Sequence, residues 1–196
     1  MDQRATVVFA TPDYVPLARE IQNRLTLKEG QLERRHFPDG ERYLRILTDV
    51  REQDVVLVGG TSSDAATLDL FDVACGIVKE GCRSLTLVIP FFGYSTMERA
   101  VKAGEIVTAK TRARLLSAIP LAPAGNRVAL LDLHTDGITY YFEGGMVPHH
   151  LYAKAVTLQA VRDLGGTGDF VLGSVDAGRA KWVESLANDL GVTASI

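Results

Sequence analysis

The stretch VVLVGGTSSDAATLDLFDVACGIVKEGCRSLTLVI, residues 55–89, decides the fold of this chain. Its two ends, Val55–Val58 and Leu85–Ile89, are short apolar runs, and the segment between them has the spacing of an amphipathic helix. Ser and Asp residues can cap the start of that helix, and Gly81 can end it. The apolar residues that share one helical face are Leu70, Ala74, Ile77 and Val78. The stretch therefore predicts a strand, a helix over about 61–81 and a second strand.

The same alternation of strands and helices continues on both sides of this stretch. The further apolar runs that predict strands are 5–10, 128–131 and 170–172, and the segments with helical spacing are about 107–118, 151–164 and 178–190. The predicted strands are nearly continuous apolar runs, which is typical of strands covered on both sheet faces. The sequence thus predicts an α/β fold with a largely parallel sheet flanked by helices.

The segment Gln31–Leu47, QLERRHFPDGERYLRIL, breaks this alternation. It predicts a strand, a tight turn and a second strand, because Pro, Asp and Gly occupy positions 38–40. FPDGE is therefore first of all a hairpin turn, and a contact with a ligand needs support from elsewhere in the sequence.

A change of organisation is expected near Gly144–Pro148, where GGMVP can form a linker. We expect a first domain over 1–147 and the beginning of a second, similar domain over 148–196. The second domain contains one complete predicted strand and a run at 191–196 that resembles the start of another. A parallel sheet cannot be completed from so few strands, so we expect this domain to be incomplete within the 196 residues.

Composition and charge exclude several classes of partner. The formal net charge is −3, so no basic excess indicates nucleic-acid binding. No apolar run approaches the roughly 18 residues that a membrane span needs, and the N-terminus lacks the pattern of a signal peptide. The two cysteines are too few for a disulfide framework, which favours buried or free thiols. We therefore expect a cytoplasmic protein that binds neither nucleic acid nor membranes.

Polar groups follow three of the predicted strands, where open parallel sheets bind their ligands. The first of these strand ends is PFFGY, after Ile89. Asp132 and His134 follow the strand ending near Leu131, and alternation places both on the same side of an extended chain. Asp176 follows the strand near residue 172. Two interpretations stay open for these residues. They are either a binding site or a solvated strand end, and Asp176 can equally cap the next helix.

Two further segments carry polar or charged residues without a recognisable site motif. Gly93–Glu105, GYSTMERAVKAGE, has no amphipathic period and is either a mobile loop over a substrate or a surface connection. The pair His149–His150 lacks a partner four residues away, so we expect it at the start of a helix rather than in a metal site. No P-loop, nucleophile-elbow or zinc-protease motif is present. The residues alone predict an α/β protein with a candidate acidic and histidine site for a metal-bound ligand.

The chain resembles the ribose-phosphate pyrophosphokinase family, also called phosphoribosyl pyrophosphate (PRPP) synthetases. The motifs that carry the resemblance are FPDGE (37–41), VIPFFGY (88–94), EIVTAK (105–110), DLHTDGI with YF (132–142) and SVDAG (174–178). Each motif alone is weak, but their order and spacing extend over nearly the whole chain. The resemblance implies two similar domains of phosphoribosyltransferase type, with a parallel sheet flanked by helices in each.

The activity that the resemblance implies is transfer of a pyrophosphoryl group from Mg-ATP to ribose 5-phosphate, giving PRPP and AMP. The implied partners are ATP, ribose 5-phosphate and further copies of the chain in dimers or hexamers, and the implied cofactor is Mg²⁺. By resemblance, Phe37, Asp39 and Glu41 contact the adenine of ATP across a subunit interface. His134 is the implied catalytic residue and, together with Asp176, holds magnesium near the phosphates.

The chain departs from the family in two places. The family's loop after its PYFGY motif usually continues ARQD, whereas Thr96, Met97 and Glu98 stand here, followed by Arg99. Loss of an Arg removes a charge-assisted contact with a triphosphate, which Arg99 or Lys102 can replace. The family's ribose 5-phosphate residues are not found in this sequence, so we expect a divergent member whose 196-residue chain is inactive alone. The alternative is a non-catalytic regulatory subunit related to PRPP synthetases.

Overall fold

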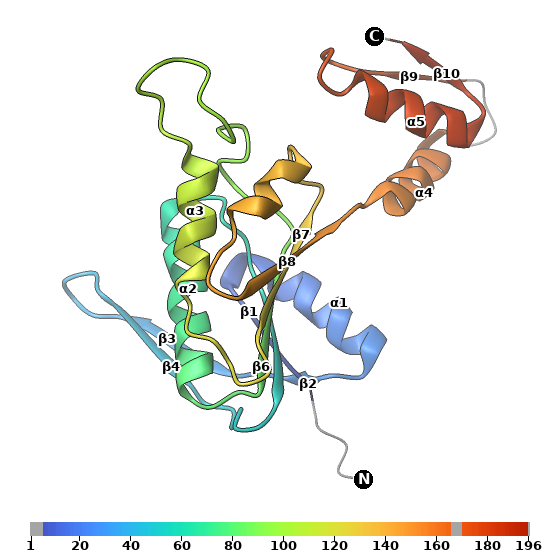
Figure 1. Cartoon of the computed structure of the whole chain (residues 1–196). Coiled ribbons are helices and arrows are strands. Elements are labelled where there is room, and N and C mark those ends of the chain that lie inside the picture. Colours follow the sequence, from blue (N-terminus) through green and yellow to red (C-terminus); the bar gives the residue numbers. More distant parts are fainter. Residues whose placement is uncertain (1–5, 166–169, 196) are drawn as a thin grey trace. The chain divides into compact units, whose positions relative to one another are not determined.

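The computed structural model describes residues 6–165 and 170–195, which fall into two compact units, Met1–Leu151 and Tyr152–Ile196 (Figure 1). Ala5 and Ile196, at the outer ends of two predicted strands, lie outside the described residues. None of the helices formed by the described residues is long and apolar enough to cross a membrane.

A six-stranded sheet in the order β2-β1-β5-β6-β7-β8 forms the centre of the first unit. Every neighbouring pair in this sheet is parallel, which confirms the predicted parallel α/β fold. The strands are β1 (Thr6–Ala10), β2 (Lys28–Glu29), β5 (Asp54–Val58), β6 (Ser84–Ile89), β7 (Asn126–Leu131) and β8 (Met146–Leu151). Because all strands run the same way, their carboxyl ends lie along one edge of the sheet.

Helices cover the two faces of this sheet unequally. The predicted helices α2 (Asp64–Lys79) and α3 (Thr108–Ser117) pack on one face, and α1 (Val15–Leu25) lies on the other, as Figure 1 shows. Ser63 caps α2, because its side chain accepts a hydrogen bond from the amide of Ala66 at 3.1 Å. The shorter helical turns of this unit are η1 (Pro12–Tyr14) and η2 (Asp136–Tyr141).

Alternate side chains of each strand enter two separate cores. Val7 and Phe9 of β1 belong to the large core under α2 and α3, whereas Val8 packs with Ala18 of α1. This division follows from the period-2 geometry of a strand. It also explains why the central strands are apolar at nearly every position.

The predicted hairpin is present as β3 (Leu32–His36) and β4 (Arg42–Ile46). The two strands pair in antiparallel fashion, with Leu32 opposite Ile46 and His36 opposite Arg42. Gly40 has a φ of +92°, in the region that only glycine adopts without strain. The hairpin forms a separate sheet that projects beside α2 in Figure 1.

The first compact unit extends a few residues beyond the expected boundary at residue 147. Residues 146–151 form β8, which pairs with β7, so the expected linker over Gly144–Pro148 runs into a strand and the first compact unit ends at Leu151. His149 and His150 therefore lie on an edge strand and do not begin a helix. The helix expected from residue 151 begins only at Lys154.

The second unit contains α4 (Lys154–Gly165), β9 (Val171–Gly173), α5 (Ala180–Leu190) and β10 (Thr193–Ser195). Its two short strands pair in parallel, which confirms that the run after Gly191 is a strand. Lys154 joins the two helices, since its Nζ lies 2.7 Å from Ser185 Oγ and 2.9 Å from Asp189 Oδ2.

Candidate functional site

The segments that follow β5, β6 and β7 meet at the carboxyl edge of the sheet. The amide of Thr61, after β5, donates to the carbonyl of Phe91, after β6, at 3.1 Å. The rings of Phe92 and Phe142 are 6.1 Å apart and link the segment after β6 to the end of η2. The structure thus brings together two of the strand ends that the sequence singled out, those after β6 and β7, in the position where parallel sheets bind ligands. The third, after β9, belongs to the second unit.

The loop after β6 begins at a very close backbone contact. Gly93 donates its amide to Thr61 Oγ1 at 2.8 Å, and both groups are buried. A Cβ at position 93 would lie 2.0 Å from the carbonyl oxygen of Thr61. Only glycine therefore allows this approach, which fixes the origin of the loop.

Tyr94 then enters the left-handed region with a φ of +61° and joins a polar cluster. Its hydroxyl donates to Asp64 Oδ1 at 2.8 Å, and the guanidinium of Arg112 pairs with the same oxygen. The Arg112 Cζ lies 4.7 Å from the centroid of the Tyr94 ring. We call Asp64, Tyr94 and Arg112 the loop clamp, because they tie the loop to the first turn of α2 and to the middle of α3.

The four residues at the positions of the expected ATP-binding loop differ in exposure. Thr96 and Arg99 are exposed, whereas Met97 and Glu98 are half-buried. Met97 bridges the loop to α3, because its amide donates to Tyr94 and its carbonyl accepts from Ala109 at 3.3 Å. The carbonyl of Glu98 accepts from the hydroxyl of Tyr141. Only Arg99 among these four presents a positive charge, with its Nε 3.5 Å from the carboxylate of Glu98.

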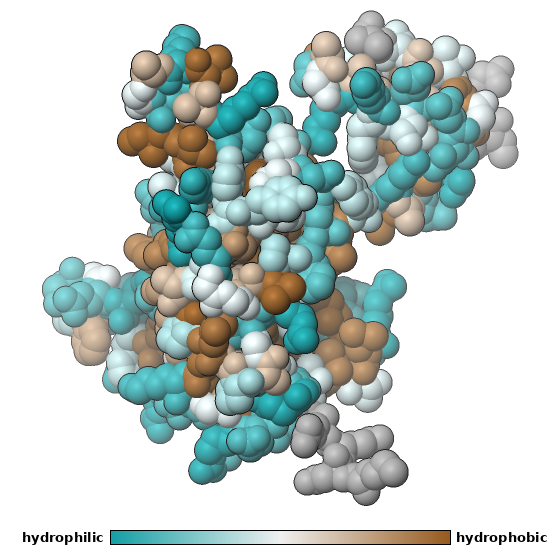
Figure 2. Space-filling view, viewed as in Figure 1, coloured by the Kyte–Doolittle hydropathy of each residue, from teal (hydrophilic) through white to brown (hydrophobic). Residues whose placement is uncertain are grey.

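Glu105 holds the far end of this loop. Its Oε2 accepts hydrogen bonds from the amides of Val101, at 2.7 Å, and Lys102, at 3.0 Å. These backbone hydrogen bonds lower the pKa of the Glu105 carboxyl, because they stabilise its ionised form. Val101 and Ile106 leave most of their apolar surface exposed here, and Figure 2 shows apolar surface on this projecting loop.

The hairpin tip carries the three residues expected to contact adenine. The side chain of Asp39 shapes the turn, because its Oδ1 accepts from the amide of Glu41 at 3.0 Å. Phe37 is exposed and meets Tyr43 edge to face at a centroid distance of 6.1 Å. The guanidinium of Arg35 lies 4.0 Å from the Tyr43 centroid and 5.8 Å from that of Phe37. The tip therefore offers an aromatic and charged surface to solvent.

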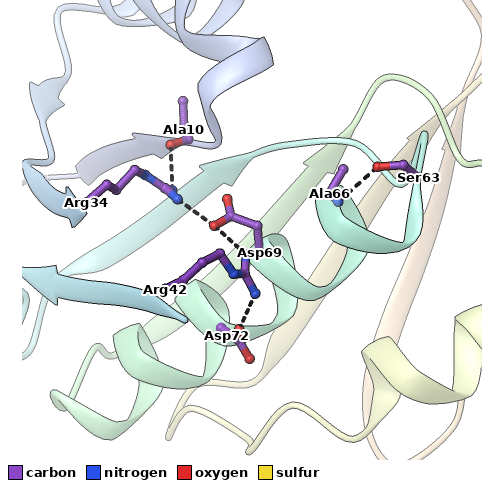
Figure 3. A network of polar contacts seen from close by, with 7 residues as sticks. All are labelled: Ala10, Arg34, Arg42, Ser63, Ala66, Asp69 and Asp72. Atoms are coloured by element: carbon purple, nitrogen blue, oxygen red, sulfur yellow. Dashed lines mark hydrogen bonds and ion pairs between the residues drawn. The ribbon is translucent and has the colours of Figure 1, made fainter. Parts of the chain in front are cut away.

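The strands of the hairpin are tied to α2 by a network of ion pairs, shown in Figure 3. Asp69 Oδ1 accepts from Arg34 at 2.5 Å and from Arg42 at 3.0 Å, and Arg42 also contacts Asp72 at 2.7 Å. Arg34 reaches further to the carbonyl of Ala10 at 3.5 Å. Asp69 is buried, so loss of either arginine partner would leave its carboxylate with less compensation than at a surface ion pair.

The segment that carries His134 leaves β7 through an abrupt change of direction. β7 ends at Leu131, and Asp132 has a φ of +43°. Leu133 is buried, with Asp132 and His134 exposed on either side of it. The exposure of both follows the alternation seen in the sequence, although the strand itself ends before them.

Asp176 lies in the second unit and acts there as a turn residue. Its Oδ1 accepts from the amide of Arg179 at 3.0 Å, just before α5 begins, and its carbonyl accepts from Ser174 Oγ at 2.6 Å. This contact stabilises the turn before α5, but the N-cap of that helix is Arg179, so Asp176 is not the capping residue that the sequence offered. The expected part of Asp176 in binding magnesium stays a prediction.

The two cysteines are free thiols, as expected. Burial raises the pKa of both thiols, and that of Cys82 rises to about 11. A thiol with a raised pKa is a poor nucleophile, so neither cysteine is a candidate for catalysis.

Comparison with known proteins decides the family. The family defined as the N-terminal domain of ribose phosphate pyrophosphokinase matches residues 6–119. The chain belongs to the ribose-phosphate pyrophosphokinase family. It is 31% identical over 196 residues to a ribose-phosphate pyrophosphokinase of Xylella fastidiosa and 27% identical over 201 residues to that of Mycoplasma genitalium.

The fold agrees with this family. The crystal structure of phosphoribosylpyrophosphate synthetase from Mycobacterium smegmatis superposes with a TM-score of 0.84 at 22% identity, over 97% of this chain and 63% of that one. The chain spans 59% of the Xylella pyrophosphokinase and 58% of the Mycoplasma one. At this identity and coverage the comparisons establish the family and the fold.

Magnesium is the cofactor that the family resemblance implies, so the described side chains can be compared with the ligands that this ion needs. The ion prefers oxygen ligands. Within residues 6–165 and 170–195, no three His, Cys, Asp or Glu side chains are close enough together to hold a metal ion. His134 offers ring nitrogens, and Asp176 belongs to the other unit. Magnesium is usually held by one or two carboxylates together with substrate phosphates, an arrangement that does not require such a cluster.

Several residues of the candidate site were not found from the sequence. The loop clamp joins Asp64, Tyr94 and Arg112, which are far apart in the chain. His150, expected at the start of a helix, instead contacts the segment of His134. The position of Tyr94 directly after the FFG motif was a usable signal, whereas no local pattern marks Arg112.

Proposed function

We propose that this chain supplies the ATP-binding part of a ribose-phosphate pyrophosphokinase. The reaction transfers a pyrophosphoryl group from Mg-ATP to the C1 hydroxyl of ribose 5-phosphate and yields PRPP and AMP. The match of the family over residues 6–119 carries the proposal, because that range contains both the hairpin and the loop after β6. The gathering of polar strand ends at one sheet edge supports it.

The hairpin tip is proposed to bind the adenine. Phe37 presents an exposed aromatic face on which a base can stack, and its contact with Tyr43 limits its freedom. Asp39 holds the turn through the amide of Glu41. Glu41 is left exposed and can accept a hydrogen bond from an exocyclic amine. A tip that projects from its own unit can serve a neighbouring subunit, which supports the expected homo-oligomer.

The loop and the segment after β7 are proposed to bind the polyphosphate. Arg99 and Lys102 are exposed cations in the loop after β6. His134 is exposed in the segment after β7, which is the strand next to β6 in the sheet. Pyrophosphoryl transfer depends mainly on positioning and on neutralisation of the developing charge. His134 therefore acts as a hydrogen-bond donor to the phosphates, and magnesium accompanies the ATP phosphates as part of the substrate.

ATP binding by the 196-residue chain tests this proposal. Calorimetric titration with Mg-ATP should show binding that Phe37→Ala weakens and that His134→Ala weakens, on the order of tenfold each. Leu25→Ala is the matched control, because Leu25 is exposed on α1 away from the site. Equal affinities for all four proteins would contradict these roles.

A parallel assay should follow AMP formation. We propose that this chain alone does not form AMP from ATP in response to ribose 5-phosphate, because its sequence lacks the family's residues for that sugar. Formation of AMP that depends on ribose 5-phosphate would overturn that part of the proposal.

The second candidate is a non-catalytic subunit that binds and regulates active pyrophosphokinases. Thr96 and Met97 favour it, because neither supplies the charge that a triphosphate needs, and Met97 is half-buried against α3. Absence of any ATP binding, together with association with an active family member, would support this candidate over the first.

A further inference from the structure

His150 contacts the backbone next to His134 from the neighbouring strand. The amide of Leu133 donates a hydrogen bond to His150 Nε2 at 2.9 Å. His150 lies on β8, where it pairs with Leu130 of β7, and its side chain is only 10% exposed. The contact is therefore shielded from water and joins the edge strand to the segment of His134.

The direction of this hydrogen bond defines the tautomer of His150. A peptide N–H can only donate, so Nε2 must carry a lone pair. The proton of the neutral ring then lies on Nδ1, which is 2.7 Å from Asp136 Oδ1 and can donate to it. Both ring nitrogens thus form hydrogen bonds. Nε2 contacts Leu133, just before His134 in the sequence, and Nδ1 contacts Asp136, just after it.

The segment between these two contacts needs such support. Asp132 has a φ of +43°, a conformation that costs roughly 1–2 kcal/mol for a residue with a side chain. Its amide donates to the carbonyl of Leu151 at 2.9 Å, so β8 contacts the segment at Asp132, at Leu133 and at Asp136. An imidazole accepts and donates on opposite sides of one rigid ring, which suits it to bridge two points of a turn.

We propose that His150 is a positioning residue for His134: its imidazole, protonated at Nδ1, holds the turn Asp132–Asp136 in the shape that presents His134 to the phosphates. The proposal rests on the proposed function in so far as His134 touches ATP. His149, its neighbour on β8, is exposed and belongs to the other face of the strand, so it provides a matched control.

Nuclear magnetic resonance of the isotopically labelled chain tests the structural half without a substitution. The nitrogen chemical shifts of His150 should report a protonated Nδ1 and an unprotonated Nε2. A ring protonated at Nε2 would overturn the proposal, because the Leu133 amide would then have no acceptor.

Substitutions of His150 test the hydrogen bond between the Leu133 amide and Nε2 by removing it. His150→Phe keeps a ring and removes both nitrogens, so the Leu133 amide should exchange with solvent roughly tenfold faster. His150→Gln places a carbonyl oxygen near the former Nε2 and should restore much of the protection. His149→Phe should change nothing at Leu133. Unchanged protection in His150→Phe would contradict the proposal.

Titration with Mg-ATP tests whether His150 affects ATP binding through His134. His150→Phe should weaken ATP binding, and the double variant His134→Ala, His150→Phe should bind no more weakly than His134→Ala alone, because the first residue acts through the second. Additive losses would show that His150 acts independently of His134 and would overturn the positioning role. Failure of the unsubstituted chain to bind ATP would instead overturn the proposed function, while the tautomer and the Leu133 amide would still report on the contact itself.

Discussion

Arg112 of α3 lies against the ring of Tyr94, with its Cζ 4.7 Å from the ring centroid, and both side chains contact Asp64 Oδ1. Three chain segments are thereby joined at the origin of the loop that carries Thr96–Arg99. The Arg112 side chain is 24% exposed, so its ion pair and its contact with the ring are partly protected from water. This clamp gives the candidate nucleotide loop a fixed base even though its far end projects into solvent.

Arg112→Ala should loosen the loop more than it destabilises the fold. The substitution removes one ion pair and one cation–π contact, which together contribute roughly 1–2 kcal/mol. We expect faster amide exchange at Tyr94–Met97 and an affinity for Mg-ATP several-fold weaker, with urea denaturation showing the smaller global loss.

Arg114→Ala provides the control for that experiment. Arg114 lies on the same helix and pairs with Glu143 at 3.0 Å, but that pair is more than half exposed. Its loss should leave both amide exchange in the loop and ATP binding unchanged. Equal effects of the two substitutions would contradict a specific role of the clamp.

The sequence predicted the elements whose signal is local. The strands β5, β6 and β7 and the helices α2 and α3 were found because long apolar runs and helical spacing mark buried elements in any context. Helix α1 was missed, since Ala18 is the only buried residue among its eleven. Strand β8 was missed because Pro148 and two histidines interrupt the apolar residues of MVPHHL. As an edge strand paired only with β7, it tolerates Pro148 and two histidines.

Some residues of the candidate site could likewise be predicted from the sequence, and others could not. Polar residues at the ends of buried strands, such as His134, could be read from the sequence because parallel topology alone brings them to one edge. The contact of His150 with the Leu133 amide could not, since a backbone N–H has no signature in the sequence. Nor could the sharing of Asp69 by Arg34 and Arg42, which depends on how the hairpin packs on α2.

Gly93→Ala should be among the most damaging small substitutions in the chain. The added Cβ would lie 2.0 Å from the carbonyl oxygen of Thr61, which is backbone and cannot rotate away. We expect a loss of about 2–4 kcal/mol in the free energy of unfolding, measured by urea denaturation. Gly137→Ala is the control, because the nearest atom to its Cβ would be 3.8 Å away. A loss below that of the control would show that the loop can move aside at no cost.

Asp69→Ala should release the hairpin from α2. The substitution leaves Arg34 and Arg42 without their shared carboxylate, and their side chains are only 25% and 30% exposed. We expect a destabilisation of about 2–4 kcal/mol and faster amide exchange along β3 and β4. Asp72→Ala removes only the more exposed contact of Arg42 and should cost less than about 1 kcal/mol. The reverse order of the two losses would show that Asp72, not Asp69, anchors the hairpin.

Glu105 should make the end of the loop sensitive to acid. Hydrogen bonds from the amides of Lys102 and Val101 lower the pKa of its carboxyl from the ordinary 4.5. For a carboxyl with a lowered pKa in the folded state, the stabilisation is present above the ordinary value and is lost as the pH falls through the lowered one. The amide resonances of Val101 and Lys102 should therefore keep their positions at neutral pH and shift with a midpoint below 4.5.

Glu105→Gln separates this titration from general unfolding in acid. The glutamine oxygen can still accept from one of the two amides but does not titrate, so the acid-dependent shift at Val101 and Lys102 should disappear while the rest of the spectrum is unchanged. A shift that persists in Glu105→Gln would mean that another group titrates there. A midpoint at or above 4.5 in the unsubstituted chain would mean that the two hydrogen bonds do not hold the loop in solution.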